Sequence, residues 1–336
     1  MEQAHVEEKS TTAGEEEADF IAIPVSALQS DTVTQFDLYI RGKGETPVLY
    51  RSADLPFSEE AWARLHERKI GVLWIPSSQS RAYRLYLEAN LGAILSDRSV
   101  PLEERSELLY QSAQGLVKEV LQDPRAGDLM QRSGTMVEHM VQFMFREGRS
   151  FYHLMRVTSF DYYTYTHSVN VFVFATALAQ SMGHPEEEVA EFGQGALLHD
   201  LGKSLIDDTI LNCPGRLTPE QWEVMRKHPI YGHELLKEQG VESEVICDVT
   251  RHHHCKLNGK GYPDGLRNDE ISEWCRIVTV CDIFDALTTR RSYKDAMQSF
   301  EALRLMKEEM SDELDRDVFH QFVKLMAKPD RPSKKL

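Results

Sequence analysis

Seven side chains of the kinds that bind metal ions occur between positions 167 and 282 of this 336-residue chain. They are five histidines and two aspartates: His167, His199, Asp200, His228, His253, His254 and Asp282. Imidazole and carboxylate ligands together suit first-row transition metals better than calcium or magnesium. Seven ligands exceed the needs of one tetrahedral ion. Two ions about 3.5–4 Å apart that share a carboxylate would use all seven, and such a pair promotes in-line displacement at phosphorus.

Further motifs surround these residues. The chain carries HSVN at 167–170, HDLGK at 199–203, ILN at 210–212 with PG at 214–215, KHP at 227–229, HH at 253–254, GKGYPDGL at 259–266 and RIVTVCDIFDALT at 276–288. In this order and spacing, over residues 161 to about 325, they resemble the HD-GYP family of cyclic di-GMP phosphodiesterases. A lone His-Asp doublet would be a weak signal, whereas the whole set is a specific one.

The resemblance implies a role for each residue. Asp200 would bridge two divalent ions, with His167, His199 and Asp282 completing one site and His228, His253 and His254 the other. A hydroxide that bridges the ions would attack the phosphodiester, with Asp200 and Lys203 as catalytic residues. The substrate would be bound by Lys203, Tyr262, Arg291 and Lys294. The ions would be iron or manganese, with nickel and zinc as alternatives.

The activity that the resemblance implies is hydrolysis of cyclic di-GMP to linear pGpG, with onward cleavage to GMP left open. Two alternatives stay open: a non-catalytic cyclic-dinucleotide sensor that signals through a protein partner, and a phosphohydrolase of another nucleotide, such as cyclic GMP-AMP or an alarmone. Three departures from the family pattern matter here, one of which is Cys213 in place of the usual lysine before Pro-Gly. Tyr163 stands where some members carry a glutamate ligand for a third ion, which favours two ions. Cys255 replaces a glutamate after the histidine pair, which predicts a slow enzyme.

The composition limits where the protein acts. A formal charge of −16 argues against a nucleic-acid polymer or an anionic membrane as the main partner. Five cysteines without a disulfide-scaffold pattern indicate a reducing compartment. No apolar run has the length of a membrane span and the N-terminus lacks signal-peptide features, so we expect a cytoplasmic protein without membrane insertion. A homodimer through the N-terminal module or the following helices, and a protein partner at the Gly-Tyr-Pro loop, stay open.

Sequence patterns predict a mainly α-helical protein, in which an all-α HD-GYP bundle follows a small α/β module. We expect a disordered acidic tail at 1–19, the α/β regulatory module at 20–98, linking helices at 99–158, the HD-GYP catalytic domain at 159–326 and a basic tail at 327–336. Within the module we expect strands at 20–28, 36–41, 48–51 and 71–75, and helices at 58–68 and 80–95.

The predicted helices of the catalytic domain place the ligands on facing elements, as is usual for a metal site in a bundle. A helix that begins at Pro185 carries His199 near its end. A capping box opens a helix that leads to His228, and the proline that follows puts this histidine at a helix end or corner. Asp282 and Asp285 share one face of a later helix.

Overall fold

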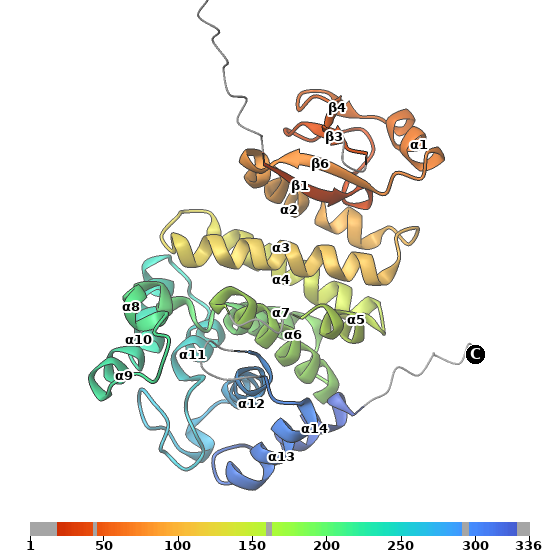
Figure 1. The fold of residues 1–336 in the computed structure, drawn as a ribbon. Helices are drawn as coiled ribbons and strands as arrows, with labels where there is room; N and C mark the ends of the chain where they lie inside the picture. The colour runs from red at the N-terminus through yellow and green to blue at the C-terminus, as the bar shows by residue number, and fades with distance from the viewer. Residues whose placement is uncertain (1–18, 43–45, 159–162, 291–295, 328–336) are drawn as a thin grey trace, which may run out of the picture. The chain divides into compact units, whose positions relative to one another are not determined.

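The computed structural model describes residues 19–42, 46–158, 163–290 and 296–327. Contacts divide the chain into two compact units, which separate between Asn90 and Leu91, inside helix α2. The N-terminal unit holds short strands and helices, and the second unit contains no strand among its described residues (Figure 1). The prediction of a mainly α protein with a small α/β module is therefore confirmed, while the expected domain limits stay predictions.

Four short strands form the antiparallel sheet of the N-terminal unit. They are β1 (Phe20–Pro24), β3 (Leu38–Ile40), β4 (Val48–Arg51) and β6 (Val72–Pro76), in the order β1-β6-β3-β4. The strand expected over 20–28 is too long, because a 3₁₀ helix, η1 (Val25–Ala27), follows Pro24. The pairing of β2 (Thr32–Val33) with β5 (Pro56–Phe57) is not predicted, since two residues are too few for an alternating pattern.

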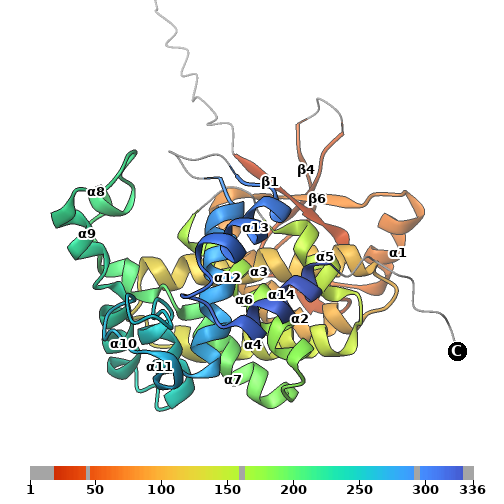
Figure 2. The same cartoon turned by 90° about the horizontal axis from the view of Figure 1, so that it is seen from below.

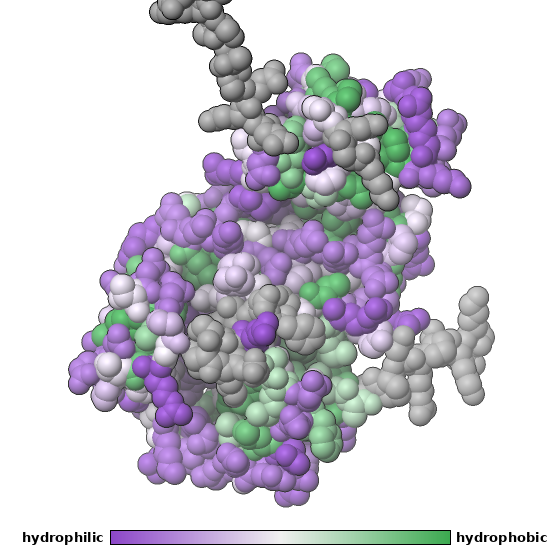
Figure 3. Space-filling view, in the orientation of Figure 1, coloured by the Kyte–Doolittle hydropathy of each residue, from purple (hydrophilic) through white to green (hydrophobic). Residues whose placement is uncertain are grey.

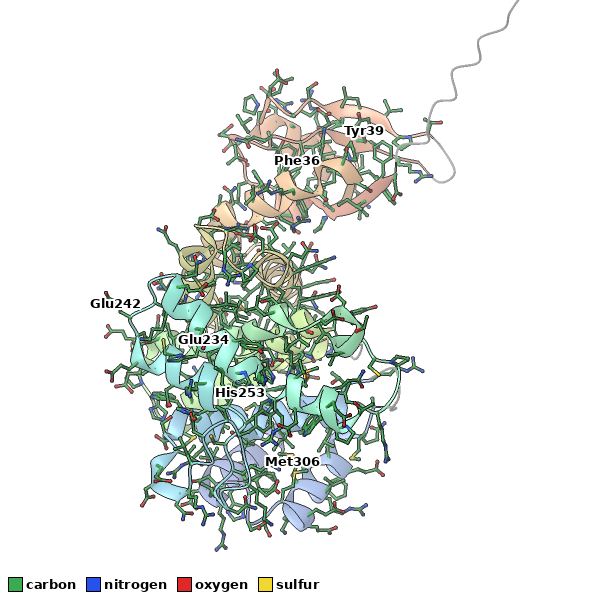
Figure 4. The ribbon with its side chains drawn as sticks, turned by 90° about the vertical axis from the view of Figure 1, so that its left-hand side faces the viewer. Phe36, Tyr39, Glu234, Glu242, His253 and Met306 are labelled. Carbon is green, nitrogen blue, oxygen red and sulfur yellow. The ribbon has the colours of Figure 1, made fainter. Side chains whose placement is uncertain are left out.

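Two helices complete this unit. Ser58 caps α1 (Glu59–Glu67), since its side chain accepts a hydrogen bond from the Ala61 backbone N–H. A 3₁₀ turn, η2 (Ser77–Gln79), leads directly into α2 (Ser80–Ser96). Phe36 is fully buried, with Tyr83 and Tyr86 edge-to-face at centroid distances of 5.5 Å (Figure 4). This aromatic group anchors the core of the module.

The second unit is a bundle of helices. The helices before the predicted ligands are α3 (Leu102–Gln122), α4 (Leu129–Arg146) and α5 (Ser150–Val157). Those around the ligands are α6 (Thr164–Met182), α7 (Glu186–Leu198), η3 (Leu201–Leu205), α8 (Asp208–Leu211), α9 (Pro219–Met225), α10 (His228–Glu238), α11 (Glu244–His252), η4 (Asn268–Glu270) and α12 (Glu273–Thr288). The last two are α13 (Ser299–Glu309) and α14 (Arg316–Met326). The helices expected over 99–158 are thus observed.

Helix α6 is the centre of this bundle. Every residue from Thr166 to Ala179 is buried, so the helix is covered on all sides, as expected of a segment that is apolar all round. It packs against α3, α7, α12 and α14. Figures 1 and 2 show α12 beside α6, with α13 and α14 following it. The first turn of α6 and the middle of α12 are therefore held together by the core.

Local signals in the sequence set the helix starts near the ligands. Thr218 forms the predicted capping box with Gln221, and Pro219 is the first residue of α9. That helix does not itself carry His228, because it ends at Met225 and His228 opens the next helix, α10. The expected corner is present, but His228 lies on the later helix, where the following Pro229 is tolerated in the first turn.

The described residues contain no helix that is both long and apolar enough to cross a bilayer. On the face drawn in Figure 3, hydrophilic residues dominate the surface of each unit, and apolar patches are scattered between them. Scattered apolar residues are normal on a protein surface and call for no partner.

Candidate metal centre

Five helices bring the seven predicted ligands together. His167 lies in the first turn of α6, His199 and Asp200 follow α7, His228 opens α10, His253 and His254 follow α11, and Asp282 lies on α12. Their ligand atoms form two groups, each within 4.8 Å: His167 with His199 and Asp282, and Asp200 with His228, His253 and His254. All are buried except His254, which is half-buried. Figure 4 shows His253 inside the unit, whereas Glu242 lies at its edge.

The carboxylate of Asp200 lies between the two groups. Its Oδ2 is 3.5 Å from Nε2 of His167 and 3.4 Å from Nε2 of His199. Its Oδ1 is 3.2 Å from Nε2 of His228 and 3.9 Å from Nε2 of His253. One oxygen faces each group, which is the arrangement that a shared carboxylate needs.

A glycine two residues after Asp200 makes this placement possible. A Cβ atom at Gly202 would overlap the carbonyl oxygen of His228 and the backbone nitrogen of Gly232. The 3₁₀ turn after Asp200 therefore packs backbone to backbone on the start of α10, and no larger residue fits there. This close approach brings the carboxylate within reach of His228.

Hydrogen bonds fix which nitrogen of each buried histidine carries the proton. The Nδ1 atoms of His199, His228 and His253 donate to the carbonyl oxygens of Ala196, Met225 and Thr250, at 2.8, 2.8 and 3.0 Å. Nδ1 of His167 lies 2.7 Å from Oδ2 of Asp285. A carbonyl only accepts, so the neutral rings carry their proton on Nδ1 and leave a lone pair on Nε2.

These Nε2 lone pairs face one another without a proton between them. The Nε2 atoms of His167 and His199 are 3.4 Å apart, and those of His228 and His253 are 3.2 Å apart. Oδ1 of Asp200 is buried and has no hydrogen-bond partner. Unpaired acceptors that converge in a buried space are costly unless a cation lies between them. The donor set therefore fits divalent metal ions, and imidazole with carboxylate suits transition metals.

The electrostatics of the site favour its metal-binding protonation state. Burial lowers the pKa of His199 and His253, and lowers that of His254 to about 3, so these rings stay neutral. Burial alone would raise the pKa of Asp200, but Lys203 and His199 outweigh it and hold that pKa well below its usual range. The pKa of Asp282 is likewise lowered, because its histidine neighbours outweigh its burial.

An outer carboxylate that we did not assign from the sequence supports the site. Asp285 accepts from His167 and, through Oδ1, from the Asn170 side-chain amide at 2.8 Å. The Tyr110 hydroxyl donates to Oδ1 of Asn170 at 2.6 Å. All of these side chains are buried. The shared helix face of Asp282 and Asp285, and the one-turn spacing from His167 to Asn170, are the sequence signals that could have indicated them.

Lys203 contacts the centre directly. Its Nζ lies 2.6 Å from Oδ2 of Asp200, and its side chain is only 13% exposed. A buried ammonium group next to the shared carboxylate can follow negative charge that arrives with a substrate. The other two predicted substrate residues with basic side chains, Arg291 and Lys294, lie outside the described residues.

Tyr262 links the centre to a second aromatic side chain. Its ring is 4.6 Å from His254 and 6.4 Å from Trp222, and the Arg226 guanidinium lies 5.0 Å above it. Trp222 is 46% exposed. A Cβ at Gly261 would overlap the backbone of His254 and its neighbours, so the loop lies directly on the ligand segment. Trp222 and Arg226 lie about 40 residues before Tyr262, and no sequence pattern pointed to this contact.

Cys255 and Tyr163, two of the departures from the family pattern, lie in different surroundings. Cys255 is buried, its thiol lies 3.6 Å from the Tyr262 carbonyl oxygen, and burial raises its pKa to about 11. A protonated thiol that faces a carbonyl is a poor metal ligand. Tyr163 is the N-cap residue of α6, is 57% exposed and stacks on Tyr165 at 5.3 Å.

His252, the first of three consecutive histidines, lies outside both ligand groups. Its Nδ1 is 2.6 Å from Oδ1 of Asp248, and its Nε2 is 2.9 Å from Oδ2 of Asp264 in the Gly-Tyr-Pro loop. Arg251 also donates to Asp264, at 2.8 and 3.1 Å. Asp248 and His252 approach Cys275 as well, but hydrogen bonds occupy both ring nitrogens and burial raises the pKa of that thiol well above its usual value. This cluster ties the loop to α11.

The fold and the site together define an HD-domain protein, whose His-Asp doublet lies at the centre of an α-helical bundle. A family model described as "HD domain" matches residues 94–318. Cyclic di-GMP phosphodiesterase PA4108 of Pseudomonas aeruginosa is 33% identical over 294 residues, which cover 84% of this chain and 71% of that protein. The chain belongs to the HD-GYP family.

Two further comparisons mark out the relationship. The 3'3'-cGAMP-specific phosphodiesterase 3 of Vibrio cholerae is 35% identical over 157 residues, which cover 47% of this chain and 34% of that protein. The solved structure of Bd1817, a HDG"Y"P protein from Bdellovibrio bacteriovorus, has a TM-score of 0.64 at 21% identity and covers 92% of this chain and 99% of that one. This last likeness concerns the fold.

Proposed function

We propose that the chain is a metal-dependent phosphodiesterase that hydrolyses cyclic di-GMP to linear pGpG. The observation that carries the proposal is the Asp200 carboxylate, which lies between two groups of converging histidine lone pairs. The Pseudomonas aeruginosa relative, named for this activity, aligns with 84% of the chain. When bound, divalent ions would supply an acidic water as the nucleophile and positive charge against the phosphoryl oxygens.

We assign His167, His199 and Asp282 to one ion and His228, His253 and His254 to the other, with Asp200 shared. Iron or manganese fits this mixed set of imidazole and carboxylate ligands, and nickel or zinc would also fit. The Nδ1 hydrogen bonds of His167, His199, His228 and His253 hold these four rings with Nε2 toward the centre, so they need little rearrangement on binding.

Side chains at the edge of the metal centre would bind the substrate. Lys203 would move from Oδ2 of Asp200 to a phosphodiester oxygen, since its long side chain can follow the larger negative charge. Tyr262 would orient the nucleotide beside His254. Arg291 and Lys294 would bind the second phosphate of the ring, a role that rests on their positions in the sequence.

A cyclic GMP-AMP substrate is the second candidate, because the Vibrio cholerae relative named for that substrate matches nearly half of the chain. The two substrates differ in one purine. Metal ions held by these ligands would contact the phosphate and not the purine, so they would not distinguish the two substrates. Discrimination would have to come from side chains at the edge of the centre.

The test uses full-length protein purified without oxygen and loaded with iron(II) or manganese(II). Cyclic di-GMP and cyclic GMP-AMP are supplied separately, and the products are separated by chromatography. We expect pGpG from cyclic di-GMP at the higher kcat/KM, and no product from Asp200→Ala. Stoichiometric binding without turnover in the metal-loaded protein would instead identify a sensor, and faster cleavage of cyclic GMP-AMP would reassign the substrate.

A further inference from the structure

The N-terminal unit contains a hollow of about 230 Å³ between its sheet and helix α1. Its polar wall consists of Arg51 on β4, with Arg64 and Arg68 at the end of α1. The apolar floor includes Ile40 and Leu65. We call this space, lined by the three arginines, the arginine hollow. It belongs to the unit that carries none of the metal ligands.

None of the described residues provides a counter-charge to the three guanidinium groups. The structure records no ion pair and no side-chain hydrogen bond between any of them and a described residue. Nε of Arg51 is buried from solvent and has no hydrogen-bond partner. A buried donor without an acceptor costs folding free energy, and the cost is larger when the group is charged. The hollow therefore contains a buried donor that a bound acceptor would satisfy.

The chain has a formal charge of −16, so it is rich in carboxylates. Several of its arginines pair with them: Arg105 with Glu147, Arg132 with Glu119 and Arg276 with Asp315. Basic residues at the end of a helix are favoured by the helix dipole, which accounts for Arg64 and Arg68 as surface residues. The helix dipole does not account for Arg51, which lines the same space from a strand. Nor does it account for the pairing of Arg64 with Arg68, because like charges four residues apart on a helix repel each other.

The walls are tied together, so the hollow is preformed. The Tyr50 hydroxyl donates to the Ala61 carbonyl oxygen in α1 at 3.0 Å, which links β4 to the helix next to the hollow. Leu65, between the two helical arginines, is 1% exposed and fixes that face of α1 on the core. The backbone positions that carry the three arginines are therefore held in place, which lowers part of the entropy cost of binding an anion.

We propose that the arginine hollow binds the phosphoryl group of a small anionic metabolite. Guanidinium groups are permanently charged, and their planar donors match phosphate oxygens two at a time. Pockets for drug-sized ligands measure about 300–1,000 Å³, so 230 Å³ suits a phosphate or a pyrophosphate better than a whole dinucleotide. Free phosphate, pyrophosphate and the 5′-phosphate of a nucleotide share this chemistry.

The test is calorimetric titration of the metal-loaded full-length chain with phosphate, pyrophosphate and GMP. Phosphate also has affinity for metal ions, so the informative quantity is the difference between variants. We expect the double variant Arg64→Gln/Arg68→Gln to lose one class of site, with at least tenfold weaker binding. Arg81→Gln removes an exposed arginine on α2 outside the hollow and should bind as wild type. Identical isotherms for wild type and the double variant would overturn the proposal.

Hydrogen exchange locates the site independently of the metal centre. Added phosphate or pyrophosphate should slow exchange in β4 and α1 in wild type and not in the double variant. If circular dichroism shows that the double variant is unfolded, Arg68→Lys serves instead. This change keeps the charge but removes the planar pair of guanidinium donors, so it should weaken binding. Protection by GMP but not by phosphate would assign recognition to the base, and protection by chloride equal to that by phosphate would leave only unspecific charge. Either result sinks the proposed phosphoryl site, whereas loss of cyclic di-GMP hydrolysis alone would not.

Discussion

The Nδ1 atom of His167 and Oδ2 of Asp285 lie 2.7 Å apart, although Asp285 belongs to neither ligand group. Asn170 and Tyr110 extend the contact into a buried line of hydrogen bonds that links α6, α12 and α3. The line fixes the ring of His167 so that its Nε2 points toward Asp200 and Asp282. Outer partners of this kind set both the orientation and the basicity of a metal-binding histidine.

Asp285→Asn should therefore weaken metal binding without removing a ligand. An amide keeps the shape but loses the negative charge that holds the Nδ1 proton of His167. We expect metal affinity to fall by about 10–100-fold, measured by competition with a chelator. Asp317→Asn, at an exposed position on α14, is the matched control and should bind metal as wild type. Equal affinities for the two variants would show that the contact only packs the core.

Part of the way in which the ligands converge could be predicted from the sequence. Residue types, spacing and helix caps place His199 at a helix end and Asp282 on a helix face, and the resemblance to the family supplies the grouping. The corner at His228 is foreseeable from Pro229, but its assignment to α10 depends on where α9 ends. Helix ends are set by a balance of weak local terms, which a pattern does not resolve.

Contacts between elements that are distant in the chain could not be predicted from the sequence. The link between Tyr262 and Trp222, and the arginine hollow, join elements whose spacing in the chain carries no periodic signal. The short ribbon of β2 and β5 also escapes pattern analysis, because tertiary pairing rather than alternation defines it. The sequence predicts what each element presents, whereas packing decides which elements meet.

Replacing the shared carboxylate should disrupt both ligand groups at once. In Asp200→Ala, each group loses the oxygen that faces it, and Lys203 loses its partner. We expect the metal content of purified protein to fall from two ions per chain to less than one, with hydrolysis of cyclic di-GMP below detection. Plasma mass spectrometry gives the metal content and chromatography the product. Retention of two ions would exclude Asp200 as a shared ligand.

Lys203→Ala should separate substrate contact from metal binding. The lysine offers no lone pair to a metal while protonated, so we expect the metal content to stay near that of wild type. Loss of one charge-assisted contact to phosphate should lower kcat/KM by about 10–100-fold, from the roughly 1.5–3 kcal/mol of such a hydrogen bond. Lys237→Ala removes an exposed lysine from α10 and should leave both quantities unchanged. A Lys203→Ala enzyme as active as wild type at every substrate concentration would refute the assignment.

The hydrogen bonds that hold the Gly-Tyr-Pro loop on α11 should stabilise the fold less at both low and high pH. Hydrogen bonding to Arg251 lowers the pKa of Asp264, so its stabilisation is full above about pH 4 and is lost as the pH falls through the lowered pKa. Burial lowers the pKa of His252, but its bonds to Asp248 and Asp264 outweigh this and raise it. The contribution of His252 is therefore full below about pH 6.5 and is lost as the pH rises through the raised pKa.

The difference in melting temperature between wild type and His252→Gln measures this stabilisation. We expect the difference to be largest between about pH 4 and 6.5 and to shrink on either side. Asp264→Asn should remove only the part of the difference that depends on Asp264, because the bond from His252 to Asp248 remains. A difference that stays constant from pH 5 to 9 would show that His252 contributes by packing and not by charge.

Trp222 has an exposed ring that continues the aromatic surface formed by His254 and Tyr262. If a dinucleotide binds with its phosphate at the metal centre, we expect the purine of the adjoining nucleotide to reach the Trp222 ring. Stacking of a base on an aromatic side chain is worth about 1–3 kcal/mol, so Trp222→Ala should raise KM for cyclic di-GMP by about tenfold. Because the contact is remote from phosphorus, kcat should change little. Trp222→Phe should keep part of the affinity, and Trp62→Ala, at an exposed tryptophan of the N-terminal unit, should leave KM unchanged. A fall in kcat at unchanged KM would mean that Trp222 positions the loop rather than the base.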